Sequence, residues 1–375
     1  MKVSLKTLGQ IVTGNTPSKS NPEYWHSDDI SFVKPDILPD NKVADVWKTK
    51  ECISEAARSK SRIVGENAIF VTCIGSIGKI GIATKGEFAF NQQINAIIPN
   101  SKVFPKYLAY VLLNAKPRLT VMANAPVVPI INKSQFGDFQ IDISENYEEQ
   151  KRISAILDSI ESIITQQNQA LYLLDKLVKS RFVEMFAGKY EKVKLGNVAK
   201  TTSGGTPSKV HPEYYEKGSI PWLTSGEVNA GIITSVKNYI TEAAMENSSA
   251  KMVPANSVVV AMYGATAGVT GLLRLNTTTN QAVCSILPNE RFVPEYLYYA
   301  VASKKDWMIS QCQGGGQPNI SQGIIRSMEI IDAPLELQNR FAAFVSEVDK
   351  SKLAVKQSLE KLETLKKSLM QQYFG

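Results

Sequence analysis

Two loops carry the side chains with the clearest chemistry, and each combines hydroxyls, a lysine and two aromatic rings around TPSK and PEY. The matched hydroxyls and lysines are Thr16, Ser18 and Lys19 in the first loop and Thr206, Ser208 and Lys209 in the second. Such side chains commonly bind phosphate oxygens, so both loops are candidates for contact with a phosphate backbone. The aromatic rings either stack on a ligand or anchor the loop to the domain core, and anchoring is the favoured interpretation. They belong to Tyr24, Trp25, Tyr214 and Tyr215.

Amide side chains also recur at matched positions, in the segments FNQQINAIIPN and TNQAVCSILPN. They are Asn91, Gln92 and Gln93 in the first segment and Asn280 and Gln281 in the second. Asn and Gln can form two hydrogen bonds with the edge of adenine, but amides at strand ends equally satisfy the backbone of a loop. Both interpretations remain open.

Glycine-rich segments mark further loops. GSIGKIG (75–81) and GATAGVTG (264–271) lack the GKS or GKT ending of a phosphate-binding loop, which favours hairpin turns. Polar side chains on loops held by rigid strands are where base-reading residues usually lie. The further candidate contacts are Lys34, Ser76 and Lys79 in the first half, and Thr224, Ser225, Tyr263 and Thr266 in the second.

One glycine-rich loop distinguishes the two halves. QGGGQPNIS adds the amides of Gln313 and Gln317 and that of Asn319. The matching stretch NAPVVPIIN (124–132) has lost the glycines and most of the amides. We therefore expect the two halves to contact different targets.

Residues that could catalyse a reaction are not evident. No paired-carboxylate motif occurs in both halves, and the two histidines, His26 and His211, could not serve a Ser/His/Asp set. Asp36 and Asp40 with Lys42 are the nearest approach to a nuclease site, but their spacing is too tight and the second half has no copy. The four cysteines are scattered without a CxxC, which argues against structural zinc. We predict a chain without catalytic or metal-ligating residues.

The loops belong to a repeat that organises the whole chain. ISEAA matches ITEAA, and VFPKYLAY matches FVPEYLYY, at offsets between 187 and 191. Short apolar, β-rich runs end in the glycine turns, and short helices are expected at 107–113 and 296–301, each after a proline. The predicted fold is α+β, with two similar strand-rich domains at 1–145 and 188–334. Long helices follow them at 146–187 and 335–375.

Both long helices show the apolar spacing of a coiled coil. The predicted seam is Ile153, Leu157, Ile160, Ile164, Leu171, Leu174 and Val178 in the first helix, and Phe341, Val345, Val348, Val355, Leu359, Leu362 and Leu369 in the second. Gln167, Arg181, Lys352 and Lys366 interrupt it. Gln150 and Gln338, like Phe186 and Phe374, are 188 positions apart. Two copies of one helix most simply pair with each other, and a two-fold relation between the repeats requires antiparallel pairing.

Composition limits the class of protein. The chain has 375 residues, 43% hydrophobic and 21% charged, which is enough for two domains with separate cores. No run approaches 18 apolar residues and Met1 is not followed by an apolar signal segment, so we expect a cytoplasmic protein with no membrane partner. The net charge of +7 permits binding to a polyanion. Duplex DNA is the elongated, pseudo-symmetric ligand that a two-fold repeat of domains suits.

These features together resemble the specificity subunit of type I restriction–modification systems, over essentially the whole chain. The motifs that carry the resemblance are the repeated G-x-TPS-x-x-x-PEY, the NQ segments ending in IIPN or ILPN, the QPNIS loop, and the helix start EQKRISAILDSIE at Glu149–Glu161. The first domain departs from the pattern at Pro126–Asn132, which lacks the GGGQPN form.

The resemblance implies a non-catalytic subunit that reads a bipartite DNA target, one half-site for each domain, with the paired helices setting the spacer. It also implies two modification subunits, which bind S-adenosylmethionine and methylate adenine, and restriction subunits that use ATP and Mg²⁺. No cofactor is expected in this chain itself. The alternatives are a DNA-modifying or DNA-cutting enzyme with an unrecognised site, and a coiled-coil assembly protein whose domains bind protein.

Overall fold

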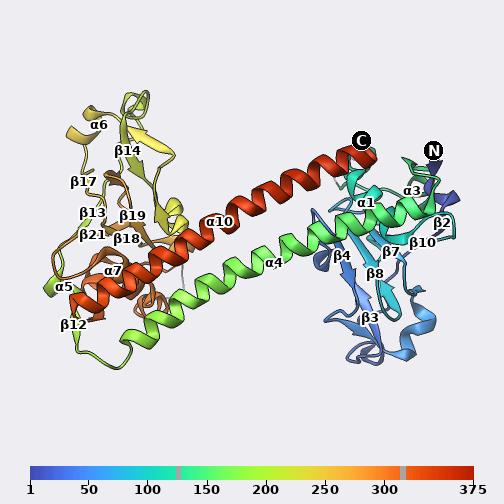
Figure 1. Cartoon of the computed structure of the whole chain (residues 1–375), viewed down its shortest axis with the longest axis horizontal. Helices are drawn as coiled ribbons and strands as arrows, with labels where there is room; N and C mark the ends of the chain where they lie inside the picture. Colours follow the sequence, from blue (N-terminus) through green and yellow to red (C-terminus); the bar gives the residue numbers. More distant parts are fainter. Residues whose placement is uncertain (124–127, 313–317) are drawn as a thin grey trace. The chain divides into compact units, whose positions relative to one another are not determined.

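The computed structural model describes residues 1–123, 128–312 and 318–375 (Figure 1). The chain forms two compact units. Unit 1 consists of Met1–Asn168 and Lys356–Gly375, and unit 2 of Gln169–Val355. Each unit is α+β, as predicted, and combines strand-rich sheets with short helices and parts of two long helices.

Unit 1 holds a five-stranded sheet in the order β2-β10-β7-β8-β4. Its strands are β2 (Gly9–Thr13), β10 (Ile94–Pro99), β7 (Ile69–Thr72), β8 (Ile80–Ala83) and β4 (Val43–Val46). A four-stranded sheet follows the order β5-β3-β9-β6, with β5 (Cys52–Ile53), β3 (Ile30–Val33), β9 (Phe88–Phe90) and β6 (Ile63–Val64). β1 (Lys2–Ser4) pairs with β11 (Gln140–Asp142). Every residue of β7, β8 and β9 is buried, because both faces of these strands are covered.

Unit 2 repeats this arrangement strand for strand. Its five-stranded sheet is β13 (Thr201–Ser203), β21 (Val283–Ile286), β18 (Val258–Ala261), β19 (Thr270–Leu273) and β15 (Ile232–Ile233), in that order. Its four-stranded sheet is β16 (Asn238–Ile240), β14 (Ile220–Leu223), β20 (Thr277–Thr279) and β17 (Met252–Val253). β12 (Lys192–Lys194) pairs with β22 (Glu329–Ile331). The two predicted domains therefore share one topology.

Short helices and tight turns lie where the sequence predicts them. α1 (Pro105–Asn114) and α7 (Pro294–Ala302) each begin with a proline, whose fixed φ suits the first helical position. The hairpins β7–β8 and β18–β19 are antiparallel, and Gly75 and Gly264 turn them with φ of 74° and 73°. The remaining short α-helices are α2 (Lys116–Met122), α3 (Lys133–Asp138), α5 (Leu195–Val198), α6 (Glu242–Glu246), α8 (Lys305–Ser310) and α9 (Gln322–Ser327). The 3₁₀ turns are η1 (Leu5–Thr7), η2 (Pro22–Tyr24), η3 (Pro35–Ile37), η4 (Glu55–Lys60), η5 (Pro212–Tyr214), η6 (Ser225–Ala230) and η7 (Gly264–Thr266).

The two long helices are α4 (Tyr147–Phe186) and α10 (Leu335–Phe374). In unit 1 the first turns of α4 and the last turns of α10 pack into one core, whereas in unit 2 the last turns of α4 pack with the first turns of α10. Within each unit, the segments of the two helices therefore pair antiparallel. Among the predicted seam residues, Ile153, Leu157, Ile160, Val178, Phe341, Val345, Val348 and Leu359 are buried. Ile164, Leu171, Leu174, Val355, Leu362 and Leu369 are half-buried.

Each helix ends against an aromatic residue of a short helix. Phe374 meets Tyr107 of α1 at 5.4 Å between ring centroids, with the rings edge to face. Phe186 meets Tyr296 of α7 in the same way at 4.8 Å. α10 thus completes the core that contains the first repeat, and α4 completes the core that contains the second.

Three of the four polar residues that interrupt the seam contact the other long helix. Lys366 of α10 forms an ion pair with Glu161 of α4 in unit 1. Lys352 lies 2.6 Å from Asp175 of α4 in unit 2. Arg181 lies over the ring of Phe344, 5.9 Å from its centroid. Ion pairs between the two helices favour one register of the pairing, because a shifted register separates the charges.

Within the described ranges, no helix is long and apolar enough to cross a membrane.

Candidate nucleic-acid interface

The predicted loops of unit 1 are tied to one another by backbone hydrogen bonds, although they are far apart in the sequence. The amide of Asn15 donates to the carbonyl of Phe90 (2.9 Å), and the amide of Asn91 donates to that of Val33 (3.1 Å). Two further amides link the remaining loops, Cys73 to the carbonyl of Gln93 (2.7 Å) and Gly75 to that of Pro129 (3.0 Å). The TPS loop, the loop after β3, the glycine turn and the amide loop therefore form one loop cluster.

Unit 2 has the same loop cluster, held by matched bonds. The amide of Gly205 donates to the carbonyl of Thr279 (2.9 Å), and that of Asn280 donates to Leu223 (3.0 Å). The amide of Met262 donates to Ala282 (2.8 Å). Tyr263 and Asn319 form an antiparallel bridge, 189 positions after the bridge of Ile74 with Ile130 in unit 1. The stretches around Asn132 and Asn319 thus occupy the same place in the two domains.

One side-chain contact recurs in both clusters. The hydroxyl of Thr16 donates to Oε1 of Gln92 (2.7 Å), and the hydroxyl of Thr206 donates to Oε1 of Gln281. Gly14 allows the close approach, because a Cβ there would overlap the carbonyl oxygens of Phe90 and Asn91. Both glutamines are exposed beside the TPS loops.

Several predicted contacts of unit 1 line one open hollow of about 430 Å³, which we name the Lys79 hollow. Its residues are Lys34, Pro35, Asp36, Ser76, Lys79, Asn91 and Gln93. Asn91 is held within its own loop: its Oδ1 accepts from the amide of Gln93 and its Nδ2 donates to Oε1 of Gln93. Of the two interpretations left open for the amides, Asn91 therefore satisfies loop backbone.

Both lysines that line the Lys79 hollow already have acidic partners. Lys34 forms an ion pair with Glu51, and Nζ of Lys79 lies 3.7 Å from Asp40. A hydrogen bond from Lys116, at 3.1 Å, holds the pKa of Asp40 below its usual range, and Lys79 adds to this effect. The Lys79 side chain is half-buried at the edge of the hollow, and its ammonium can exchange this weak ion pair for a phosphate oxygen or for the acceptor atoms of a guanine edge.

The predicted contacts of unit 2 are less concentrated. The hydroxyl of Thr224 donates to Glu227 (2.8 Å) as part of a capping box that starts η6, and Ser225 is the first residue of that turn. Burial opposes ionisation of Glu227, but hydrogen bonds from the amides of Lys237 and Thr224 outweigh it and lower the pKa of that carboxyl. The side chains of Thr224 and Glu227 thus stabilise the loop.

The remaining predicted residues of unit 2 lie at the glycine turn and the amide loop. Tyr263 is 41% exposed, and Thr266 donates weakly to its carbonyl (3.4 Å). Oδ1 of Asn280 is buried without a hydrogen-bond partner in the described part of the chain. Gln313 and Gln317 lie outside the described residues, as do positions 124–127 of the matching stretch.

The TPS loops present their hydroxyls and lysines, while their aromatic rings pack against small cores of the domains. Ser18, Lys19, Ser208 and Lys209 are exposed. Tyr24 and Trp25 are half-buried against one small core, and Tyr214 and Tyr215 against its counterpart. The rings do anchor the loops, which was the favoured interpretation of the sequence.

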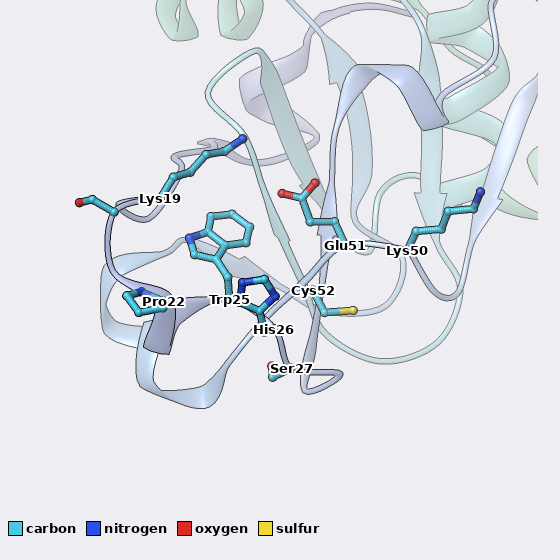
Figure 2. Close-up of a pocket in the computed structure, with 9 residues that line it drawn as sticks. Lys19, Pro22, Trp25, His26, Ser27, Lys50, Glu51 and Cys52 are labelled. Carbon is cyan, nitrogen blue, oxygen red and sulfur yellow. The ribbon is translucent and has the colours of Figure 1, made fainter.

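A second hollow of unit 1 was not predicted. It lies beside the TPS loop and includes His26 and Lys50, which no sequence motif singles out (Figure 2). Lys50 lies two residues before β5. The ISEAA segment, which begins at the last residue of β5, was interpreted only as part of the repeat. The approach of β5 to the TPS loop depends on tertiary structure, so the sequence alone could not have shown this hollow.

Comparison with known proteins identifies the family. The description "Type I restriction modification DNA specificity domain" matches residues 1–172 and again residues 188–365. The chain belongs to this family. Its two matched segments contain the two loop clusters described above.

The chain is also similar to individual members of the family. It is 25% identical over 238 residues to the EcoR124I/EcoR124II specificity subunit of Escherichia coli, and 24% identical over 286 residues to the MjaIX specificity subunit of Methanocaldococcus jannaschii. These alignments cover 57% and 69% of this chain, and 59% and 65% of the two relatives, so the chain spans less than two thirds of their length. The crystal structure of a type I restriction–modification S subunit from M. genitalium matches with a TM-score of 0.60 at 15% identity, over 100% of this chain and 96% of that one, which shows a shared fold.

Proposed function

We propose that this chain is the DNA-reading specificity subunit of a type I restriction–modification complex. The observation that carries the proposal is the pair of matched loop clusters, each in a segment that matches the DNA specificity domain. Each cluster brings hydroxyls, lysines and exposed amides together on rigid strands, which suits contact with phosphates and base edges. The differences between the clusters support two different half-sites and hence an asymmetric target.

The proposed division of labour follows the predicted boundaries. Residues 1–145 and 188–334 read the two half-sites, and the long helices at 146–187 and 335–375 set the spacer and bind the partner subunits. Chemistry is assigned to the partners: adenine methylation with S-adenosylmethionine to modification subunits, and ATP- and Mg²⁺-dependent cleavage to restriction subunits. The proposed role of this chain is recognition, without catalysis of its own.

A selection experiment tests this function. The chain, purified with its modification subunit, should select one gapped, asymmetric sequence from a library of random duplexes. The logarithm of the binding constant should fall linearly with log[salt], because phosphate contacts release counterions. Each contact contributes about 0.9 to the slope. Equal affinity for selected and shuffled duplexes would refute the proposal.

Variants assign each domain to a half-site. Lys79→Gln should relax selection at one half-site and Thr266→Val at the other. Lys85→Gln is the control for a lost charge, because Lys85 is exposed in unit 1 and does not line the Lys79 hollow. This variant should leave the selected sequence unchanged. If Lys79→Gln and Thr266→Val alter the same half-site, the assignment of one domain to each half-site is wrong.

A further inference from the structure

The unpredicted hollow of unit 1, which we name the Trp25 hollow, has the dimensions of a small-molecule site. Its volume is about 590 Å³, within the range of roughly 300–1,000 Å³ typical of ligand pockets. It is lined by Lys19, Ser20, Pro22, Trp25, His26, Ser27, Lys50, Glu51 and Cys52. Figure 2 shows the indole of Trp25 near the centre, with Lys19 on one side and Glu51 and Lys50 on the other.

The indole is fixed in position while part of its surface lines the hollow. Nε1 of Trp25 donates to the carbonyl of Ser18 (3.1 Å), and the ring packs edge to face on Phe32 with 5.2 Å between centroids. These contacts hold one edge of the ring against the core, yet the side chain is only half-buried. A pre-positioned aromatic surface of this kind can stack a planar ligand at little entropic cost.

The surrounding loop is equally constrained. Asn21 caps η2 by accepting from the amide of Glu23 (3.1 Å), and the amide of Ser54, just beyond β5, donates to the carbonyl of Tyr24 (3.0 Å). His26, at the rim, has a φ of 65°, a left-handed conformation that is uncommon outside glycine. Such conformations are retained where the surrounding structure imposes them, often at ligand sites.

The charges of the Trp25 hollow favour an anion. Lys19 and Lys50 form no ion pair with any of the residues that the structure describes. Glu51 is the carboxylate of the hollow, and its charge is met by Lys34. Two ammonium groups thus remain available on either side of an aromatic ring.

We propose that the Trp25 hollow binds one unpaired nucleotide of a DNA strand, with the base stacked on Trp25 and the phosphates on its two sides held by Lys19 and Lys50, one by each lysine. A planar base and an anionic phosphate are the two parts of a nucleotide, and they match the two kinds of group in the hollow. Bases within a duplex have both faces covered by their neighbours, so a stacking surface can receive only a base that has left the stack.

The choice of a DNA strand over a free nucleotide rests on the proposed function, because the Trp25 hollow shares Lys19 with the TPS loop. Trp25 and Lys50 would then extend the contacts of the first domain beyond its half-site. Duplexes that carry an unpaired nucleotide next to that half-site should bind more tightly than fully paired ones.

The experiment uses the full chain and a fluorescein-labelled thymidine pentanucleotide, followed by fluorescence anisotropy. Trp25→Leu retains an apolar contact with Phe32 but removes the stacking surface, and we expect it to weaken binding by about 5-fold to 100-fold. Lys50→Gln should lower the slope of log K against log[salt] by about 0.7, the value for one phosphate contact on a single strand. Circular dichroism verifies that each variant is folded, and Lys50→Gln tests the inference if Trp25→Leu does not fold.

Two control variants remove the same groups outside the hollow. Trp47, 69% exposed, and the exposed Lys48 do not line it, so Trp47→Leu and Lys48→Gln should bind like the unmodified chain. Unchanged binding by both Trp25→Leu and Lys50→Gln would overturn the inference. If thymidine monophosphate displaces the pentanucleotide when both are present at the same concentration, the assignment to a DNA strand is wrong.

The two proposals fail in different ways. If the chain selects a gapped duplex but neither Trp25→Leu nor Lys50→Gln affects binding of the pentanucleotide, only the nucleotide site is contradicted. Absence of sequence selection contradicts the specificity function, while the pentanucleotide assay still tests the hollow by its own readout.

Discussion

At the scale of single residues, two buried glutamines connect the long helices to the domains. Oε1 of Gln150 accepts from the amide of Phe104 (2.7 Å), and its Nε2 donates to the carbonyl of Ser144 (2.7 Å). Gln338 repeats this with the amide of Val293 (2.8 Å) and the carbonyl of Ala333 (2.8 Å). Phe104 and Val293 precede α1 and α7, so each glutamine satisfies backbone groups where a short helix meets a long one.

Replacing these glutamines should destabilise the fold. Gln150→Leu and Gln338→Leu each leave buried backbone groups without partners, which costs about 1–3 kcal/mol per unsatisfied group. Denaturant unfolding measures the change. Gln357→Leu is the control, because Gln357 is exposed on α10 and should change stability by less than about 0.5 kcal/mol. Equal midpoints for all three variants would show that the buried amides contribute nothing.

The cysteines should differ in reactivity. Burial raises the pKa of the Cys73 thiol to about 12, although a hydrogen bond with Asn95 offsets part of this effect. Burial alone raises the pKa of the Cys284 thiol to about 12. Thiolates are the reactive form, so both should resist iodoacetamide at pH 8, whereas the half-buried Cys312 should react first. Mass spectrometry of the alkylated native protein identifies the sites. Modification of Cys73 or Cys284 as fast as that of Cys312 would contradict the prediction, and unfolding in guanidinium should make all four equal.

At the scale of elements, the repeat made much of the fold predictable. The apolar spacing of Leu157 and Leu359 predicted the two long helices, and the glycines at 75 and 264 predicted the hairpins. The shortest strands were not predictable, because β5 (Cys52–Ile53) and β15 (Ile232–Ile233) are too short to show a period. They exist because a neighbouring strand supplies their hydrogen bonds.

The types of residue in the candidate site were predictable from the sequence, but the contacts between those residues were not. The sequence placed Thr16 and Gln92 in separate motifs, and only the packing of their loops shows that they are bonded. Lys34 was predicted to face a ligand, yet its ion pair with Glu51 depends on the approach of a distant loop. Side-chain partners of this kind follow from tertiary structure, which one sequence without its fold does not reveal.

The ion pair between α4 and α10 in unit 1 is a test of helix pairing. Lys366 and Glu161 are only 18% and 16% exposed, so removing one partner leaves a charge poorly solvated. We expect Lys366→Met to destabilise unit 1 by about 3 kcal/mol, the low end for a buried pair because both groups retain some contact with water. The double variant Lys366→Met/Glu161→Leu should recover most of that loss, since two apolar groups can pack in the seam. Chemical denaturation of the single and double variants gives the coupling.

An exposed ion pair of the same helix provides the matched control. Lys350 and Glu347 are 69% and 71% exposed, and pairs of this kind contribute about 0–1 kcal/mol. Lys350→Met should therefore leave the unfolding midpoint nearly unchanged. If the double variant in the seam is no more stable than Lys366→Met alone, the two charges do not interact as the structure indicates.

At the scale of the whole molecule, unit 1 is assembled from both ends of the sequence. Its core contains Met370 of α10 together with Ile153 and Leu157 of α4, and Leu369 and Tyr373 pack against it. Nδ2 of Asn114, at the end of α1, donates to the carbonyl of Phe374 (3.2 Å). The last turns of α10 are therefore structural parts of the unit that holds the first predicted domain.

Removing the C-terminal segment should consequently loosen the domain at the opposite end of the sequence. Deletion of residues 356–375 removes Met370 and Phe374 from the core around Tyr107, whereas Phe186 keeps its contact with Tyr296 in unit 2. Hydrogen exchange followed by mass spectrometry should show lost protection in α1 and retained protection in α7.

Phe374→Ala should give a weaker form of the same pattern. A large-to-small change in a core costs about 3–5 kcal/mol when the site is fully buried, and less at this half-buried position. Deletion of Gly375 alone, which is exposed, should change neither helix. Equal loss of protection in α1 and α7 would mean that the segment stabilises the chain as a whole, and unchanged protection in α1 would exclude its role in unit 1.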